Sequence, residues 1–130
     1  MMSEFELIQP ERPVPPIALA ATYGELIVCT VVPEEADGTI LPGDIREQSV
    51  KVFEGLATLL ASLGSGLDRV LHVTVYLRDI ADRDGMTEVW MQTFAPVFPA
   101  RATLQVGLAH PDLRIEITVI AARDAGSERS

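Results

Sequence analysis

Cysteine is nearly absent from this chain of 130 residues, which contains only Cys29. A single cysteine cannot close an internal disulfide, so the fold does not depend on an oxidised framework, and we expect a reducing, cytoplasmic setting. One cysteine and two histidines are also too few for a zinc cluster, and no metal site is expected.

Long hydrophobic runs are also missing. None approaches the roughly 18 apolar residues that a membrane-spanning helix needs. The first ten residues contain Glu4 and Glu6 but no basic stretch of the kind that begins a signal peptide. We therefore expect a protein that is neither exported nor inserted into a membrane.

Positive charge is scarce. The chain has 10 lysine and arginine residues against 19 aspartate and glutamate residues, and its net charge is −9. Such a chain repels a phosphate backbone and lacks the basic stripe that nucleic-acid binding requires. Nucleic acid is not an expected partner, and the acidic surplus is interpreted as a solvated surface.

The apolar content is sufficient for one folded domain. Hydrophobic residues make up 48% of the chain and charged residues 22%, which excludes disorder for most of it. Prolines at positions 10, 13, 15 and 16 predict an extended, proline-rich arm over residues 1–16 that lies over the surface or against a partner subunit. The domain is predicted over residues 17–123, and a polar tail over 124–130.

The apolar pattern predicts the order of elements in this domain. Residues 17–22 and the β-branched run 25–32 are predicted to form a hairpin, with the second strand buried on both faces. Asp44 and Glu47 match a helix capping box, and the helix that follows ends at Gly64. A strand over 70–77, a second helix that ends before Pro96, and strands over 102–106 and 113–122 complete the chain.

This order predicts an α+β fold, with one sheet and both helices on one of its faces. The other sheet face would carry a broad apolar patch that a solvated monomer rarely exposes. We therefore expect a homo-oligomer that buries this face, which includes Thr74, Tyr76, Leu104 and Ile120.

Two polar rows on the last strands could carry chemistry. Arg101, Thr103 and Gln105 alternate with apolar residues on one strand, as Arg114, Glu116 and Thr118 do on the next. If these strands form a hairpin, Glu116 lies opposite Thr103 and diagonal to Arg101. An arginine fork binds a carboxylate, and a nearby glutamate can orient or deprotonate water. By spacing alone, the same pair is more simply a structural ion pair.

The other reactive residue types are interpreted as structural. His72 shares a strand face with other partly polar residues and fits a packed or interface position, whereas His110 lies in a turn. Cys29 sits inside an apolar strand with no neighbouring cation to lower its pKa. Trp90 and Phe94 have helical spacing and fit the core.

Several segments resemble the Rid family, also called YjgF, of enamine/imine deaminases, and the chain is identified as a divergent member. The proline-alanine-arginine motif with a glutamate fifteen residues after the arginine is the most specific part of the resemblance, which extends over residues 14–122. The central helix agrees through Gln48, Val52, Phe53, Leu56, Leu60 and Gly64. The other segments are Val73-Thr74-Val75-Tyr76-Leu77-Arg78-Asp79, Met86-x-Glu88-Val89-Trp90, Phe98-Pro99-Ala100-Arg101-Ala102-Thr103 and Arg114-Ile115-Glu116-Ile117.

The resemblance implies a chorismate-mutase-like fold with about six strands in one mixed sheet, and a homotrimer with clefts between its subunits. It also implies the hydrolysis of 2-aminoacrylate-type enamines, or their imine tautomers, to 2-keto acids and ammonia, without a cofactor. By resemblance, Arg101 holds the substrate carboxylate, while Glu116 and the main-chain carbonyl of Thr103 position the attacking water.

The chain departs from the family pattern around the implied pocket. Ile17 stands where the family has an active-site tyrosine, in the segment Val14-Pro15-Pro16-Ile17, and Thr30-Val31 replaces a Ser-Gly pair. Thr87 and Gly55 each replace an asparagine. Thr30, Ile17 and Thr87 are therefore the expected substrate contacts beside Arg101, in a pocket that is tighter and less polar than the usual one.

Two hypotheses of function follow. The first is a cofactor-free trimeric deaminase, which the retained Glu116 favours. The second is a non-catalytic trimer of the same fold that binds a small carboxylate as a regulatory module, which the missing tyrosine favours. The family's older label of endoribonuclease is disfavoured by the net charge of −9.

Overall fold

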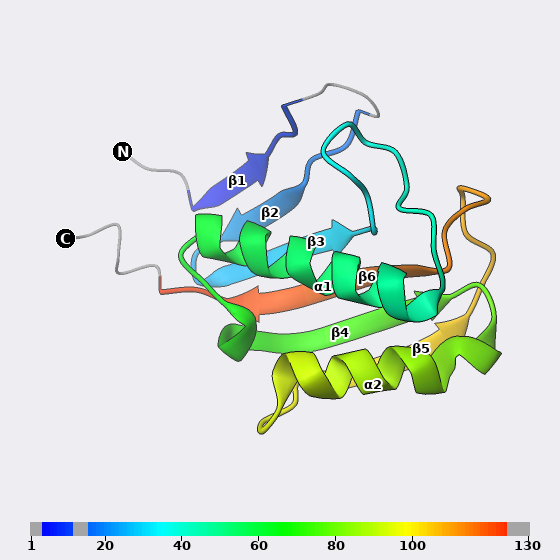
Figure 1. Cartoon of the computed structure of the whole chain (residues 1–130). Coiled ribbons are helices and arrows are strands. Elements are labelled where there is room, and N and C mark those ends of the chain that lie inside the picture. The colour runs from blue at the N-terminus through cyan, green and yellow to red at the C-terminus, as the bar shows by residue number, and fades with distance from the viewer. Residues whose placement is uncertain (1–3, 12–15, 125–130) are drawn as a thin grey trace.

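Six strands form one mixed sheet, and two helices cover one of its faces (Figure 1). The computed structural model describes residues 4–11 and 16–124. The elements in chain order are β1 (Phe5–Ile8), β2 (Ala20–Tyr23), β3 (Leu26–Val31), α1 (Ile45–Ser62), β4 (Val70–Leu77), α2 (Arg83–Phe94), β5 (Ala100–Gln105) and β6 (Ile115–Ala122), with short 3-10 turns at Leu67–Arg69 and Ile80–Asp82.

The strand order in the sheet is β1-β2-β3-β6-β4-β5. Only β4 and β5 run parallel, and every other neighbouring pair is antiparallel. The expected α+β class, with a mixed sheet of six strands and two helices on one face, is confirmed. Among the described residues, neither helix combines the length and the apolar character needed to cross a bilayer.

The first strand lies in the segment that the sequence predicts as an extended arm. Strand β1 pairs with β2, with Phe5 opposite Tyr23. Its residues are extended as expected, but they belong to the sheet, because Phe5–Ile8 contains no proline and keeps every backbone donor. The sheet therefore begins before residue 17, where we expected the domain to begin. Residues 1–3 and 12–15 of the arm and 125–130 of the tail lie outside the described residues.

The predicted hairpin of β2 and β3 is confirmed, with Tyr23 opposite Leu26. Gly24 turns the chain with a φ of 59°, a conformation that glycine adopts without strain. The expectation that the second strand is buried on both faces is wrong for the single chain. Side chains alternate, so that Ile27 is fully buried while Leu26 and Val28 are 47% and 44% exposed.

Helix α1 begins and ends as its sequence predicts. The Asp44 side chain accepts from the backbone N–H of Glu47, and the Glu47 carboxylate accepts from the N–H of Asp44. This reciprocal capping box satisfies two backbone donors that the helix itself leaves free. Gly64 ends the helix with a φ of 76°.

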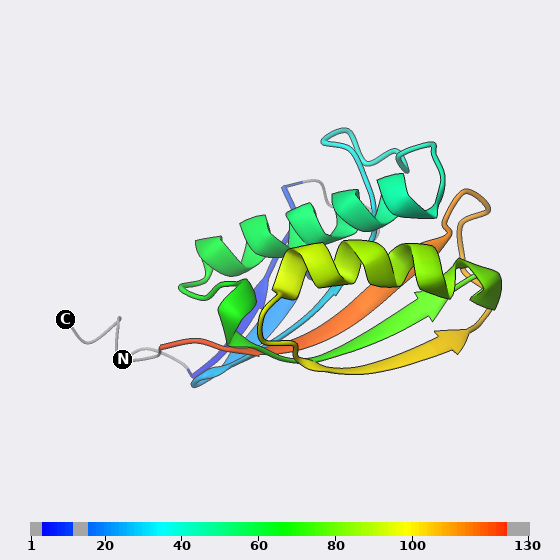
Figure 2. The same ribbon diagram turned by 60° about the horizontal axis from the view of Figure 1, so that its bottom comes forward.

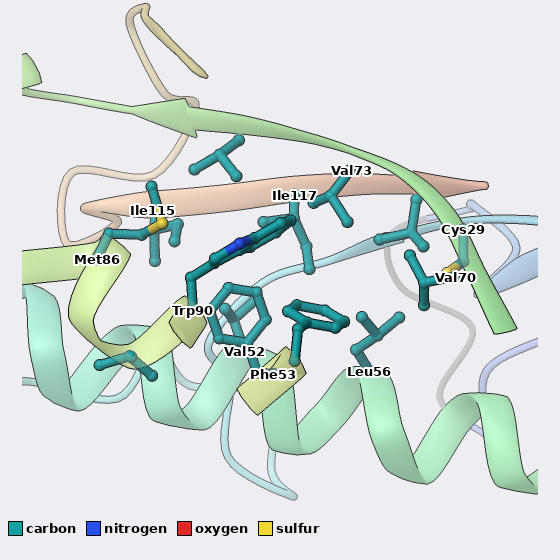
Figure 3. Packing of buried hydrophobic residues seen from close by; sticks show 14 of the residues in the cluster. Cys29, Val52, Phe53, Leu56, Val70, Val73, Met86, Trp90, Ile115 and Ile117 are labelled. Carbon is teal, nitrogen blue, oxygen red and sulfur yellow. The ribbon is translucent and has the colours of Figure 1, made fainter. Parts of the chain in front are cut away.

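The core lies between the two helices and the middle of the sheet (Figure 3). Strands β4 and β6 pair along their length and form the floor of this core. Each presents alternate side chains to the helices, and these are fully buried. They are Val73, Val75 and Leu77 on β4, and Ile115, Ile117 and Val119 on β6.

Strands β5 and β6 do not form the hairpin that their alternation suggests. Strand β4 lies between them, and β5 is the edge strand, with Arg101 opposite Val73 of β4. Glu116 is opposite Tyr76 of β4 instead of Thr103. The hairpin interpretation is wrong because the connection over residues 106–114 is long enough to pass beyond the end of β4.

The second sheet face carries no helix (Figure 2). Register places Thr30, Thr118 and Thr74 in one row across the middle of this face. Around that row stand large apolar side chains that are between 38% and 62% exposed in the single chain. We call these the bare-face residues: Phe5, Leu7, Tyr23, Leu26, Val28, Leu104 and Ile120.

Gln48 of α1 joins two loops through one buried amide. Its Nε2 donates to the carbonyl oxygens of Leu41 (3.0 Å) and Asp112 (2.8 Å), and its Oε1 accepts from the N–H of Arg114 (2.8 Å). The side chain is 1% exposed, so these backbone groups have little access to water. The amide therefore fixes the start of β6, which carries Glu116.

We predict that Gln48→Leu lowers the free energy of unfolding by about 3 kcal/mol, because it keeps the side-chain size but leaves a buried donor and two acceptors unpaired. Urea unfolding at one fixed protein concentration measures the change. Gln92→Leu on the exposed side of α2 is the control and should stay within about 0.5 kcal/mol of the parent. Equal stability of the two variants would contradict the role of the Gln48 amide.

Candidate active site

Arg101 extends from the edge strand β5 towards helix α2. Its guanidinium carbon lies 4.9 Å from the centroid of the Trp90 ring. Its Nη2 donates to Thr87 Oγ1 (3.2 Å), and its Nη1 donates to Met86 Sδ (3.7 Å). Strand alternation puts Arg101 on the helix side of the sheet, like its partner Val73. A short stretch of α2 therefore surrounds the guanidinium.

The charge of Arg101 has no acidic partner among the residues that the structure describes. Burial lowers the pKa of Arg101, and the positive charge of Arg83 lowers it further. Both causes disfavour the charged form and would be relieved by a bound anion. This arginine is therefore suited to bind a carboxylate that comes from outside the chain.

The main chain around Arg101 is accessible from the edge of the sheet. Val106 donates its N–H to Leu77 O (3.0 Å) and so faces β4. Successive residues of a parallel strand direct their backbone groups to alternate sides. Thr103 therefore directs its carbonyl to the open edge, while its side chain is on the same sheet face as that of Arg101.

Glu116 occupies the opposite sheet face. Its partner in register is Tyr76, and both side chains are partly buried on the face without helices. Burial raises the pKa of Glu116 above the ordinary glutamate range. A carboxylate with a raised pKa is better suited to accept a proton near neutral pH than a solvated one.

Arg101 and Glu116 do not converge within one chain. Their strands are separated by β4, which puts the two backbones about 10 Å apart across the sheet, and their side chains point to opposite faces. The structural ion pair that spacing suggested is therefore absent from the described chain. Any site that uses both residues needs a second copy.

The remaining expected contacts lie in two places. Thr87 touches Arg101 directly. Ile17 is 63% exposed, and Thr30 is exposed near the end of β3. Thr30 also lines a cleft of about 620 Å³ between β3, the following loop and α1. Val14 and Pro15, which precede Ile17 in the motif, lie outside the described residues.

Two departures from the family pattern face each other in this cleft. A Cβ added to Gly55 would lie 3.4 Å from Cγ1 of Val31. Val31 thus fills the space next to the helix position that lacks a side chain. An asparagine side chain at position 55 would extend beyond that Cβ and need Val31 to move, so the two substitutions are compatible as a pair.

The other reactive residue types remain structural. Burial raises the pKa of Cys29 to about 11, so its thiol is not a nucleophile at neutral pH. His110 lies in an exposed loop, and its Nδ1 accepts from the N–H of Asp112 (3.1 Å). His72 is partly buried on the bare face. No group of three or more potential metal ligands occurs among the described residues.

Sequence reasoning missed the contact between Arg101 and Trp90. Trp90 is a core residue as expected, at 5% exposed, but its ring is also the surface on which the guanidinium rests. The helical spacing of Trp90 indicates only that the residue is buried. Its contact with Arg101 also depends on the parallel pairing of β4 with β5, which puts the Arg101 side chain on the sheet face that α2 covers.

Comparison with known proteins gives consistent results. The family model described as endoribonuclease L-PSP matches residues 18–123. The 3-aminoacrylate deaminase RutC of Acinetobacter baylyi is 35% identical over 121 residues, which cover 89% of this chain and 96% of that protein. The 2-iminobutanoate/2-iminopropanoate deaminase of Capra hircus is 32% identical over 90 residues, which cover 69% of this chain and 66% of that protein.

A solved structure agrees with these relatives. A member of the YjgF protein family from Neisseria meningitidis superposes with a TM-score of 0.80 at 28% identity, over 95% of this chain and 98% of that one. The family model covers most of the chain, and the two named relatives are both deaminases of enamine or imine compounds. The chain therefore belongs to the endoribonuclease L-PSP family, which is the Rid/YjgF family that its motifs indicate.

Proposed function

We propose that this protein hydrolyses small enamines and imines of the 2-aminoacrylate type to 2-keto acids and ammonia, without a cofactor, at a site shared between copies of a homotrimer. The observation that carries the proposal is Arg101, a partly exposed arginine at the open edge of the sheet with no acidic partner among the described residues. The names of two relatives of this chain, both deaminases, supply the reaction class.

Arg101 is proposed to hold the substrate carboxylate. The planar guanidinium can donate two parallel hydrogen bonds to a carboxylate, which fixes the orientation of a small substrate as well as its position. Thr87, which already accepts from Arg101 Nη2, limits the directions in which the guanidinium can turn.

Glu116 is proposed to activate water. Tautomerisation moves one proton from the enamine nitrogen to carbon and gives the imine. Water oxygen then bonds to the imine carbon as the electron pair of the C=N double bond moves to nitrogen, while the Glu116 carboxylate accepts one water proton and passes it to that nitrogen. The carboxylate next takes the proton of the new hydroxyl and passes it to nitrogen, so that the carbonyl forms, the carbon–nitrogen bond breaks and ammonia leaves. The Thr103 carbonyl at the open edge can accept the second hydrogen of the attacking water.

The site is proposed to lie between copies because a single chain separates its two charged groups. The edge of β5 carries Arg101 and the Thr103 carbonyl, whereas Glu116 stands on the bare face. Contact between the β5 edge of one copy and the bare face of the next is heterologous, and such contacts can close into a ring. A trimer of this kind also covers the exposed bare-face residues.

Ile17, Thr30 and Thr87 are proposed to shape the pocket around the substrate. Ile17 and Val31 supply apolar walls, and the Thr30 hydroxyl supplies a hydrogen-bonding group. This composition favours small imines with short apolar side chains. We also propose a cytoplasmic location, which is supported by the single buried Cys29, and a partner set without nucleic acid or membrane.

The alternative is a trimer that binds a small carboxylate without turnover. The exposed Ile17, which replaces a hydroxyl-bearing ring in the family pattern, is the observation that favours it. This alternative keeps the role of Arg101 and removes that of Glu116, so variants of the two residues separate the hypotheses.

We predict that Arg101→Lys weakens the binding of pyruvate about tenfold or more, because an ammonium cannot reproduce the planar fork. Isothermal titration calorimetry measures the affinity of parent and variant. Arg69→Lys is the matched control, since this exposed arginine lies in the turn before β4, and it should leave the affinity unchanged. Equal affinity of Arg101→Lys and the parent would remove Arg101 from the site.

We predict that Glu116→Gln lowers the rate of imine hydrolysis by about 10² to 10⁴-fold, because an amide keeps the shape but cannot accept a proton. Pyruvate formation from 2-aminoacrylate generated by a dehydratase measures the rate. Pyruvate binding should survive the change. Glu88→Gln, on the exposed side of α2 in an ion pair with Arg46, is the control.

The pH dependence gives a second check on Glu116. The carboxylate must be ionised to accept a proton, so kcat/KM should fall as the pH falls through its pKa. Because burial raises that pKa, the fall should begin at a higher pH than for a solvated glutamate. A parent that binds pyruvate but hydrolyses no imine would favour the non-catalytic alternative, and an active Glu116→Gln variant would exclude Glu116 as the base.

A further inference from the structure

All the contacts that hold the Arg101 guanidinium in the described chain are with neutral groups. They are the face of the Trp90 ring, the Thr87 hydroxyl and the Met86 sulfur. Arginine has a long side chain with many rotamers, so an arginine without a fixed partner samples many positions. Neutral contacts restrict this motion without cancelling the positive charge.

The Trp90 ring is itself held rigidly by aromatic neighbours. It meets Phe53 of α1 edge to face, with a centroid distance of 6.0 Å and an interplanar angle of 68°. It lies tilted against Phe94, with a centroid distance of 4.5 Å. Figure 3 shows Trp90 between Met86 and Phe53, in the layer between α2 and the sheet. The ring is a fixed surface in the core.

We propose that Trp90 is a positioning residue that acts through Arg101: its ring holds the guanidinium at the open edge of the sheet and leaves the charge free for the substrate carboxylate. The inference rests on the proposed function, because it concerns the same arginine. It adds a residue that spacing assigns only to the core.

An aromatic ring suits this task better than an acidic residue would. The negative face of the indole attracts a cation, and this attraction strengthens where water is excluded. A glutamate in the same place would also fix Arg101, but it would compete with the substrate carboxylate for the same hydrogen bonds. Arg83 adds positive charge nearby, so the region around the guanidinium favours an incoming anion.

The test compares three core variants by pyruvate calorimetry and by imine hydrolysis. We expect Trp90→Leu to weaken pyruvate binding about tenfold and Trp90→Phe about threefold, since phenylalanine keeps a weaker aromatic face. KM should rise in proportion while kcat changes little, because the lost interaction holds the substrate carboxylate in the ground state and the transition state alike.

Phe94→Leu is the matched control. Phe94 is 6% exposed, close to the 5% of Trp90, and it contacts the same aromatic cluster, but the guanidinium lies over the Trp90 ring. Pyruvate affinity of Phe94→Leu should stay within about twofold of the parent. Equal losses in Phe94→Leu and Trp90→Leu would overturn the positioning role, as would unchanged binding in Trp90→Leu.

Side-chain NMR of the arginines tests the contact between Arg101 and Trp90 directly, without a substrate. The variant used is Trp90→Phe, which keeps an aromatic ring in the core. The ring current of Trp90 should displace the Arg101 Nε–H resonance, which Arg101→Lys identifies, and Trp90→Phe should reduce the displacement. An undisplaced resonance in the parent would overturn the inference. If the parent binds and hydrolyses its substrate while Trp90→Leu does so equally well, the positioning role fails and the proposed function stands.

Discussion

The placement of β4 between β5 and β6 determines what a single copy of this protein can do. Strand β4 pairs with both neighbours along its length, and its inward side chains Val73, Val75 and Leu77 are fully buried under the helices. Such buried aliphatic residues are costly to move. The register that they fix assigns Arg101 to the helix side and Glu116 to the bare side. The two groups with the most evident chemistry are thus kept apart.

The Arg101 guanidinium and the Glu116 carboxylate, which one chain keeps apart, are both ionisable groups whose charged forms burial disfavours. Burial and the positive charge of Arg83 disfavour the charged form of Arg101 and so lower its pKa. Its guanidinium contacts neutral groups, such as the Trp90 ring, where an ion pair would have an acidic side chain. Burial disfavours the ionised carboxylate of Glu116 and so raises its pKa, on a face lined with exposed apolar side chains. A contact between the β5 edge of one copy and the bare face of another would bring both groups to one small-molecule site. It would also remove apolar surface from water, which stabilises the assembly.

The elements of the fold could be predicted from the sequence because each has a strong local signal. Asp44 and Glu47 set the start of α1, Gly64 its end, and the alternation through Val73, Val75 and Leu77 defines β4. The strand pairing could not be predicted in this way. Consecutive strands usually pair, but the 106–114 connection passes the end of β4, and no residue in it signals this path.

The candidate site was predictable only in part for the same reason. Arg101, Glu116 and Thr87 carry motif signals, and the structure brings Arg101 and Thr87 together. The separation of Arg101 from Glu116 depends on which strand lies between them, and alternation on each strand contains no such information. Trp90 has the spacing of a core residue, and its contact with Arg101 depends on the parallel pairing of β4 with β5.

The central claim is that Arg101 and Glu116 of different copies act in one site, and mixing two inactive variants tests it most directly. Arg101→Ala and Glu116→Gln proteins are dissociated, reassembled together in equal amounts and assayed for imine hydrolysis. If the site is shared in a closed ring, about a quarter of the sites regain both residues, and activity should return to about that fraction of the parent. A mixture that assembles into mixed oligomers but remains inactive would contradict the account.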